Sequence, residues 1–254
     1  MTDNITKEIY DKHASSWERR EPNSLSDFTG RPAVFKLCGD VSGLKILDIG
    51  CGEGYCSRAL KAMGANHVEG IDISPEMIEL AKQQEKSNPM GINYLTGDVT
   101  CLAYDDNSFD MVLGMFVYNY LTVEETEKSF SDVYRVLKPG GTFVFAVPHP
   151  AFPQIKKDDS PPFYFDFNNA GYFSSRNQRH HGEIFCRDGK QLPVQMVHKL
   201  FEDYFNGLSS SGFTNIPIVR ELGVHDSHME IDKAFFAPVY DIPLHLAFRI
   251  EKNG

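Results

Sequence analysis

The residues best suited to chemistry form a short glycine-rich run that begins with an acid. Residues 48–54 read Asp-Ile-Gly-Cys-Gly-Glu-Gly and overlap the apolar segment 44–49, which we expect to be a buried parallel strand. Glycine at alternate positions suits a tight strand-to-helix turn, because glycine adopts backbone angles that a Cβ disfavours and lets a ligand approach the backbone. The pattern therefore predicts a nucleotide-like ligand that lies across this turn, next to Asp48.

The spacing of the glycines distinguishes two kinds of nucleotide site. A dinucleotide fingerprint, G-x-G-x-x-G, would place its third glycine at position 55, which is Tyr55 in this chain. A second acid, Asp72, follows the predicted strand 67–71 and is placed to accept hydrogen bonds from ribose hydroxyls. The two features together favour a nucleoside ligand other than a nicotinamide dinucleotide.

The run also resembles motif I of the class I S-adenosylmethionine-dependent methyltransferases, and two later segments extend the resemblance. Gly97-Asp98-Val99 resembles the segment in which an acid and the next backbone amide read the edge of adenine. Lys138-Pro139-Gly140-Gly141 resembles the turn before the family's fifth strand. The resemblance spans most of residues 5–147 and is nearest to the small-molecule "type 11" group, which includes ubiquinone/menaquinone-type C-methyltransferases and toxoflavin-synthase-like N-methyltransferases.

This resemblance implies S-adenosyl-L-methionine as the cofactor and S-adenosyl-L-homocysteine as its product. An N-terminal helix with Tyr10 and Trp17 would close over the cofactor, and Arg31 would pair with the methionyl carboxylate, because a guanidinium fork fits that group. Two plainer roles stay open, in which Trp17 fills the core and Arg31 is a surface charge. The cofactor-binding residues that the resemblance implies are Tyr10, Trp17, Arg31, Asp48, Gly50, Cys51, Gly52, Gly54, Asp72, Ile73, Asp98, Val99 and Met115.

Strand and helix patterns alternate along the chain. Apolar segments predict strands at 44–49, 67–71, 92–95, 109–114, 142–147, 216–222 and 244–251, and residues of helical period predict helices at 55–63, from 75, at 123–137 and at 197–210. The alternation predicts an α/β fold, a doubly wound, mostly parallel seven-stranded sheet of the Rossmann-like methyltransferase type with a cap inserted after strand five. We expect four parts: an N-terminal helical lid (1–40), a cofactor-binding core (41–147), a loop-rich substrate cap (148–196), and the last helix and two strands of the core (197–254).

Methyl transfer from a sulfonium needs the acceptor to be held in line with an already activated carbon. Candidate residues follow strands four and five, at the carboxyl edge of the sheet where ligands bind. We expect Tyr118 and His149 to be catalytic, and histidine is the better acid or base because it titrates near neutrality. Two alternatives stay open: His149 is held by its flanking prolines, and the aromatic side chains of 148–196 form a simple cap core. The expected acceptor-binding residues are Phe116, Asn119, Tyr164, Tyr172, His180, His181 and His198.

The sequence favours chemistry without a metal. His225-x-x-His228-x-Glu230 has ligand types that suit zinc but lacks a fourth ligand. Cation-dependent catechol-type enzymes would place an acid after the fourth strand, where residues 115–117 are Met-Phe-Val. We therefore expect a direct, metal-independent displacement.

Composition narrows the partners and the compartment. The chain has 35 acidic and 25 basic residues, a formal net charge of −10, and no Lys/Arg cluster, so we expect neither nucleic acid nor a membrane as a partner. Five cysteines without a C-x-x-C pair and an N-terminus without an apolar signal segment indicate a cytoplasmic protein. We expect a monomer or a homodimer with a small-molecule methyl acceptor.

The combined expectation is a methyltransferase that modifies N or O, with C as a further option, of a small aromatic or heterocyclic metabolite. Two alternatives come from other classes. One is a nicotinamide-dependent oxidoreductase, which Tyr55 disfavours. The other is a pseudoenzyme that binds the cofactor and acts as a partner-binding module.

Overall fold

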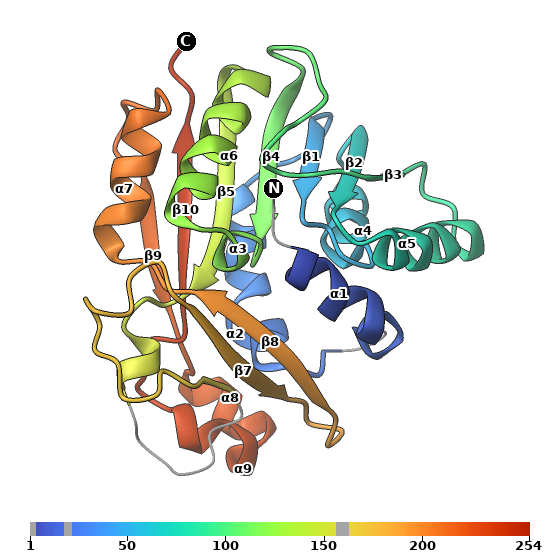
Figure 1. Ribbon diagram of the computed structural model, residues 1–254. Helices are drawn as coiled ribbons and strands as arrows, with labels where there is room; N and C mark the ends of the chain where they lie inside the picture. The colour runs from blue at the N-terminus through green and yellow to red at the C-terminus, as the bar shows by residue number, and fades with distance from the viewer. Residues whose placement is uncertain (1–3, 18–21, 156–162) are drawn as a thin grey trace.

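Figure 1 shows the computed structural model, which describes residues 4–17, 22–155 and 163–254. Its main sheet has seven strands in the order β3-β2-β1-β4-β5-β10-β9. All neighbouring strands are parallel except β10, which is antiparallel to both β5 and β9. The expected mostly parallel seven-stranded α/β sheet is therefore confirmed. The strands are β1 (Lys45–Ile49), β2 (His67–Asp72), β3 (Asn93–Thr96), β4 (Phe109–Met115), β5 (Leu137–Pro148), β9 (Ile218–Leu222) and β10 (His245–Glu251).

Successive side chains of a strand point to opposite faces of the sheet, so the apolar strands expose apolar side chains on both faces. Helices cover both of these faces. In β5, Phe143 and Phe145 belong to a core shared with α6 (Val123–Val136) and α7 (Phe201–Ser210). Val144, between them, belongs to a second core on the other face. That second core is shared with α3 (Arg31–Cys38), α4 (Tyr55–Ala62) and α5 (Pro75–Ser87).

The helix starts follow local capping chemistry. The Ser74 hydroxyl accepts a hydrogen bond from the backbone N–H of Met77, and Pro75 occupies the first turn of α5, as the sequence predicts. Thr122 and Glu125 form a reciprocal capping box at the start of α6. These caps fix where the chain leaves each strand end, and the strand ends are where the pocket lies.

Residues 148–196 contain more regular structure than the expected loop-rich cap. Three strands, β6 (Phe163–Phe165), β7 (Arg179–Phe185) and β8 (Gln191–Val197), form an antiparallel sheet. Val197 ends β8 instead of starting a helix, because strand pairing with Arg179 overrides the local helical pattern, and α7 begins at Phe201. Residues 156–162 of the expected cap, and 1–3 and 18–21 of the expected lid, lie outside the described residues.

In Figure 1, α1 lies just beyond the carboxyl ends of β1, β2 and β4, at the lower edge of the main sheet, and β7 and β8 lie below this edge. Within the described ranges, no helix has the length and apolarity needed to cross a membrane. The remaining helical elements are α1 (Asn4–His13), η1 (Ala14–Trp17), α2 (Leu25–Thr29), η2 (Tyr118–Tyr120), η3 (Phe152–Gln154), α8 (Asp226–Ile231), α9 (Lys233–Phe236) and η4 (Ala237–Val239).

Candidate active site

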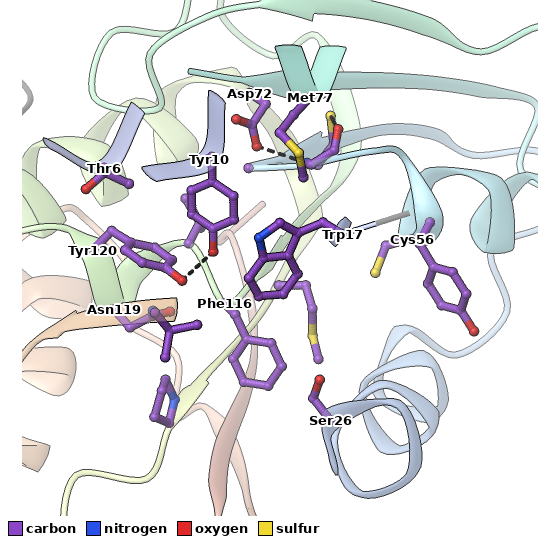
Figure 2. A pocket seen from close by; sticks show the side chains of 18 of the residues that line it. Thr6, Tyr10, Trp17, Ser26, Cys56, Asp72, Met77, Phe116, Asn119 and Tyr120 are labelled. Carbon is purple, nitrogen blue, oxygen red and sulfur yellow. Dashed lines mark hydrogen bonds between the residues drawn. The ribbon is translucent and has the colours of Figure 1, made fainter. Parts of the chain in front are cut away.

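A pocket lies between the carboxyl ends of the parallel strands, the α1–η1 segment and the inner face of the β6–β8 sheet (Figure 2). Every expected cofactor-binding residue except Gly54 lines it, and so do two of the expected acceptor-binding residues, Phe116 and Asn119. The pocket lining thus includes far more of the expected cofactor-binding residues than of the expected acceptor-binding residues. The other lining residues are Thr6, Leu25, Ser26, Tyr55, Cys56, Met77, Val117, Tyr120, Leu121, Pro148, Phe163, Phe165, Ile184, Val194 and His245.

The glycine-rich turn has the backbone that its sequence predicts. Gly50, Gly52 and Gly54 have φ values of 66°, 56° and 87°, a left-handed conformation that other residues rarely adopt. Gly54 faces away from the pocket, and a Cβ there would overlap the ring of Tyr94. Gly54 therefore serves close packing of the turn, whereas Gly50 and Gly52 lie at the pocket wall.

The Asp72 carboxylate holds this turn in place from the end of β2. Its Oδ2 accepts from the backbone N–H of Gly52 and its Oδ1 accepts from that of Ser74, both at 2.9 Å. Burial raises the pKa of Asp72, and these two hydrogen bonds oppose that shift. Each carboxylate oxygen has a second lone pair, so the group retains capacity for ribose hydroxyls.

Asp48 supplies a second, more deeply buried carboxylate. Its Oδ2 accepts from the Ser57 hydroxyl at 2.5 Å, while its Oδ1 has no hydrogen-bond partner within the described part of the chain. Burial raises the pKa of Asp48 to about 7, and the Ser57 hydrogen bond opposes the rise. An unpaired buried oxygen at the pocket wall fits a cationic ligand group such as the cofactor's ammonium.

Arg31 is buried at the pocket and is not a surface charge. Its Nη1 donates to Asp27 Oδ1 at 2.6 Å and to the Ser26 hydroxyl at 2.7 Å, and its Nε has no hydrogen-bond partner in the described ranges. Its guanidinium carbon lies 5.6 Å from the centre of the Tyr55 ring. This unpaired N–H of Arg31 fits an anionic ligand group. Asp48 and Arg31 together therefore match a ligand that carries one positive and one negative group.

The α1–η1 segment covers the pocket with two aromatic rings. The Tyr10 and Trp17 ring centres are 5.4 Å apart, and the Tyr10 and Tyr120 hydroxyls are hydrogen-bonded to each other (Figure 2). The Ser74 hydroxyl donates to Asp11 at 2.5 Å and joins α1 to the start of α5. Trp17 is thus both buried core and pocket wall.

Phe116 has an uncommon backbone at the end of β4. Its φ is 57°, in the left-handed region, and its N–H donates to Ala146 of β5. The ring centre lies 5.9 Å from the Arg31 guanidinium carbon and 5.0 Å from the His245 ring centre. Strain of this kind persists where the surroundings hold it, and here it directs an aromatic ring to the middle of the pocket.

The cap places the neighbours of an expected residue in the pocket. Phe163 and Phe165 are buried and line the pocket, whereas Tyr164 between them is partly exposed and donates from its hydroxyl to Glu183 at 3.0 Å. Because strand side chains alternate, Tyr164 lies on the outer face of β6. Tyr164, an expected acceptor-binding residue, therefore lies outside the pocket lining.

Tyr118 lies in the main core instead of the pocket. Its hydroxyl is 3.1 Å from the Ser129 hydroxyl, and its ring packs on Phe130, Phe143 and Phe145. The side chain is fully buried, and burial raises its pKa far above the usual range. The structure thus places Tyr118, an expected catalytic residue, in the core and outside the pocket lining.

His149 also lies outside the pocket lining. Its Nε2 is 3.0 Å from Glu221 Oε1, and its Nδ1 accepts from the Ala151 N–H at 3.2 Å, so both ring nitrogens are already engaged. Burial lowers its pKa, although Glu221 opposes the shift. The neighbouring Pro148 lines the pocket, and His149 turns to the other side of the chain.

The remaining expected acceptor-binding residues hold the cap together. His180 stacks on Phe167 with ring centres 3.8 Å apart, and the His181 and Gln195 side chains are hydrogen-bonded. The His198 ring bonds to the carbonyl of Tyr172, whose hydroxyl accepts from the N–H of Phe201. These side chains stabilise the cap, and the pocket lining includes none of the four expected acceptor-binding residues concerned, Tyr172, His180, His181 and His198.

His245, which no sequence pattern singles out, is the one histidine that lines the pocket in the described part of the chain. It starts β10 and pairs with Pro148 of β5 on one side and Leu222 of β9 on the other. Because β10 runs antiparallel to β5, its first residue reaches the edge where β5 ends. No local sequence pattern predicts this placement of His245. The alternation in Phe163-Tyr164-Phe165, in contrast, does indicate that Tyr164 points to the opposite face from its two neighbours.

Comparisons with known proteins agree with this geometry. Residues 46–141 match the family described as "Methyltransferase domain". The chain is 31% identical over 210 residues to demethylmenaquinone methyltransferase of Lactococcus lactis, a match that covers 78% of this chain and 75% of that relative. It is 32% identical over 106 residues to ubiquinone biosynthesis O-methyltransferase of Coxiella burnetii, over 42% and 44% of the two chains. A solved S-adenosylmethionine dependent methyltransferase from Mesorhizobium loti has a TM-score of 0.66 at 25% identity, over 87% of this chain and 96% of that one.

The chain belongs to the class I S-adenosylmethionine-dependent methyltransferases, in the type 11 group of menaquinone and ubiquinone methyltransferases. Its cofactor is S-adenosylmethionine. The predicted methyltransferase is confirmed over the nicotinamide-dependent alternative.

Proposed function

We propose that this enzyme methylates a small aromatic compound that lies between the cofactor and the cap sheet. The observation that carries the proposal is the aromatic wall formed by Phe116, Phe163 and Phe165 beyond the glycine turn. Aromatic side chains favour flat ring ligands through offset or edge-to-face contacts. The printed names of two relatives, a demethylmenaquinone methyltransferase and a ubiquinone biosynthesis O-methyltransferase, support a ring acceptor.

The cofactor end of the pocket matches the groups of S-adenosylmethionine one by one. We assign the ribose hydroxyls to Asp72, the adenine edge to Asp98 and Val99, the ammonium to Asp48 and the carboxylate to Arg31. The unpaired Asp48 Oδ1 and Arg31 Nε are the buried atoms that such a ligand would satisfy. When bound, S-adenosylmethionine supplies a methyl group on a positively charged sulfur, ready for direct displacement.

The protein's contribution is then mainly one of position. The Tyr10 and Trp17 rings cover the pocket and exclude water, and Phe116 adds its ring to the pocket wall at the end of β4. Holding two reactants in line can lower a barrier by about 7–11 kcal/mol, which makes orientation the largest available effect. We propose an oxygen or nitrogen on the ring, or a ring carbon beside one, as the receiving atom.

A labelled-methyl assay tests this proposal. The full chain is incubated with methyl-labelled S-adenosylmethionine and a fractionated metabolite extract, and labelled products are identified by mass and fragmentation. We expect labelled aromatic or heterocyclic products. Labelled products that are all aliphatic, phosphorylated or macromolecular would show that the aromatic wall serves packing only.

A further inference from the structure

His245 combines deep burial at the pocket with an unpaired ring nitrogen. The residue is 3% exposed and lines the pocket. Its Nε2 lies 3.1 Å from the Thr29 hydroxyl oxygen, while its Nδ1 is enclosed and has no hydrogen-bond partner among residues 4–17, 22–155 and 163–254. Buried polar atoms are nearly always paired in native structures, so a lone one at a pocket indicates a place for a ligand group.

The surroundings fix which nitrogen of His245 carries the proton. The Thr29 hydroxyl donates its only hydrogen to the carbonyl of Leu25 at 2.8 Å. The Thr29 oxygen can then only accept, and Nε2 of His245 must be the donor in their shared hydrogen bond. The neutral ring therefore has Nδ1 as a bare lone pair, which can accept a hydrogen bond but has none to give.

The position of the ring separates its two edges. A Cβ built on Gly30 would lie 3.3 Å from Cδ2 of His245, so the Cδ2 edge faces the turn between α2 and α3. Nδ1 is on the opposite ring edge by covalent geometry. The ring centre lies 5.0 Å from that of Phe116 and 6.2 Å from that of Phe163, which both belong to the aromatic wall.

Asn119, a second pocket residue, also has a buried hydrogen-bond acceptor without a partner among the described residues. Asn119 donates from Nδ2 to the carbonyl of Gln195 at 3.3 Å, and its Oδ1 is buried without a partner in the described part of the structure. His245 and Asn119, which both line the pocket, thus each have one enclosed, unpaired acceptor atom, Nδ1 and Oδ1. A ligand that satisfies them must bring hydrogen-bond donors.

We propose that His245 Nδ1 accepts a hydrogen bond from a donor group on the ring of the methyl acceptor, so that this enzyme selects aromatic compounds that carry a hydroxyl or amino group. The inference rests on the proposed function and names the acceptor class for the same pocket. His245 is then the residue that orients the acceptor's ring. A site built to pair a ligand's O–H or N–H rejects the analogue that lacks it, because the buried partner is left unpaired.

Electrostatics keep Nδ1 in its accepting form. Burial lowers the pKa of His245 to about 3, and the charges of Arg31 from α3 and His149 beyond β5 add to the shift. The Thr29 hydroxyl and the rings of Phe116 and Phe163 are the uncharged groups beside it. The ring stays neutral through the physiological range, so its role is to bind and orient.

The test compares two substitutions that replace different nitrogens of the same ring. His245→Asn keeps a side-chain oxygen near the position of Nδ1, whereas His245→Gln extends to the position of Nε2 and leaves Nδ1 without a substitute. The probes are 1-naphthol, 1-naphthylamine and 1-methoxynaphthalene, and their binding to protein saturated with S-adenosylhomocysteine is measured by calorimetry. We expect the wild type to bind at least one of the two donor-bearing probes about tenfold more tightly than the ether, as one lost hydrogen bond implies.

The variants should divide according to the nitrogen that they retain. We expect His245→Asn to keep most of the preference and His245→Gln to lose it, with the affinity for 1-methoxynaphthalene and for S-adenosylhomocysteine unchanged in both. Equal wild-type affinity for all three probes, no binding of any of them to the loaded protein, or a full preference in His245→Gln would overturn the inference. If either variant fails to fold, the ¹⁵N resonance of His245 Nδ1 in the wild type decides, since it must shift on addition of the tighter probe. A protein that binds neither S-adenosylmethionine nor S-adenosylhomocysteine would instead refute the proposed function itself.

Discussion

The Oδ2 of Asp72 accepts a hydrogen bond from the backbone N–H of Gly52 at 2.9 Å, so the acid at the end of β2 holds the turn that follows β1. One residue thereby serves two purposes. It stabilises the left-handed backbone of the glycine turn, and it is the group that we assign to the ribose hydroxyls. Cofactor affinity and local stability are consequently linked at this position.

Substitution of Asp72 should show this double role. Asp72→Ala removes the partners of the Gly52 and Ser74 N–H groups, so we expect the free energy of unfolding to fall by about 2 kcal/mol. Loss of the two ribose hydrogen bonds should weaken S-adenosylhomocysteine binding about a hundredfold or more. Asp72→Asn keeps one side-chain oxygen. Its stability in urea unfolding and its affinity for S-adenosylhomocysteine in calorimetry should therefore lie between those of the wild type and Asp72→Ala. An Asp72→Ala protein with unaltered affinity would contradict the assignment.

The glycine turn can be tested against a matched glycine elsewhere. Gly52 (φ 56°) and Gly91 (φ 78°) share a left-handed backbone, but Gly91 has open space around it and does not line the pocket. We expect alanine at either site to destabilise the fold by about 1–2 kcal/mol, the cost of a Cβ in this conformation. Only Gly52→Ala should also weaken cofactor binding in calorimetry. Equal binding by the two variants would show that the ligand does not cross the turn.

Cofactor binding should depend on pH through Asp48. The pKa of Asp48 is raised to about 7 by burial, so the carboxyl is largely protonated at pH 6 and has no charge to offer a cationic ligand. We expect affinity for S-adenosylmethionine to rise from pH 5.5 to 7.5, with release of about one proton per binding event near pH 6. Calorimetry in buffers of different ionisation enthalpy measures that release.

The raised pKa of Asp48 should change the stability of the fold with pH in the direction opposite to its effect on cofactor affinity. Because the folded-state pKa of Asp48 exceeds the unfolded value, its favourable contribution is complete below about pH 4 and is lost as the pH rises through 7. Asp48→Asn keeps a group that can accept from Ser57 and has no carboxyl to titrate. We expect this variant to bind the cofactor weakly and without the proton release. Undiminished release from Asp48→Asn would assign the titration to another group.

Tyr118 and Tyr120, two residues apart in the chain, should respond differently to substitution. Tyr118→Phe removes a hydrogen bond to Ser129 inside the core, and we expect a loss of about 1 kcal/mol in stability with unchanged cofactor affinity. Tyr120→Phe removes the hydrogen bond to Tyr10 of α1, and we expect cofactor binding about three- to tenfold weaker because α1 is held less firmly over the pocket. Urea unfolding and calorimetry separate the pair. Weaker cofactor binding in Tyr118→Phe would show that this side chain contributes to the pocket as well as to the core.

The cofactor end was predictable from the sequence because its signals are local. Asp48, Gly50 and Gly52 lie in one short segment of the chain, and Asp72 lies at the end of the next strand. The pairing of β1 with β2 alone therefore brings the four residues together. The acceptor end depends on pairing between distant segments. β10 inserts between β5 and β9, and this placement, which carries His245 to the pocket, has no signature in its own residues.

The histidines show that residue type alone does not identify a pocket residue. His149 and His198 are buried away from the pocket lining, where His149 bonds to Glu221 and Nε2 of His198 bonds to the Tyr172 carbonyl. His245 had no motif around it and yet is the histidine with a free acceptor at the pocket. Which imidazole meets a ligand depends on tertiary contacts that composition does not encode.

The central claim is that this pocket binds S-adenosylmethionine across the Gly50–Gly52 turn, and one calorimetric series tests it most directly. The full chain is titrated at pH 7.5 with S-adenosylmethionine, S-adenosylhomocysteine and NAD, with Asp72→Asn measured in parallel. We expect both methionine-derived ligands to bind, NAD to give no signal, and Asp72→Asn to bind both more weakly. NAD binding without a response to S-adenosylmethionine or S-adenosylhomocysteine, or equal affinities in Asp72→Asn and the wild type, would contradict the claim.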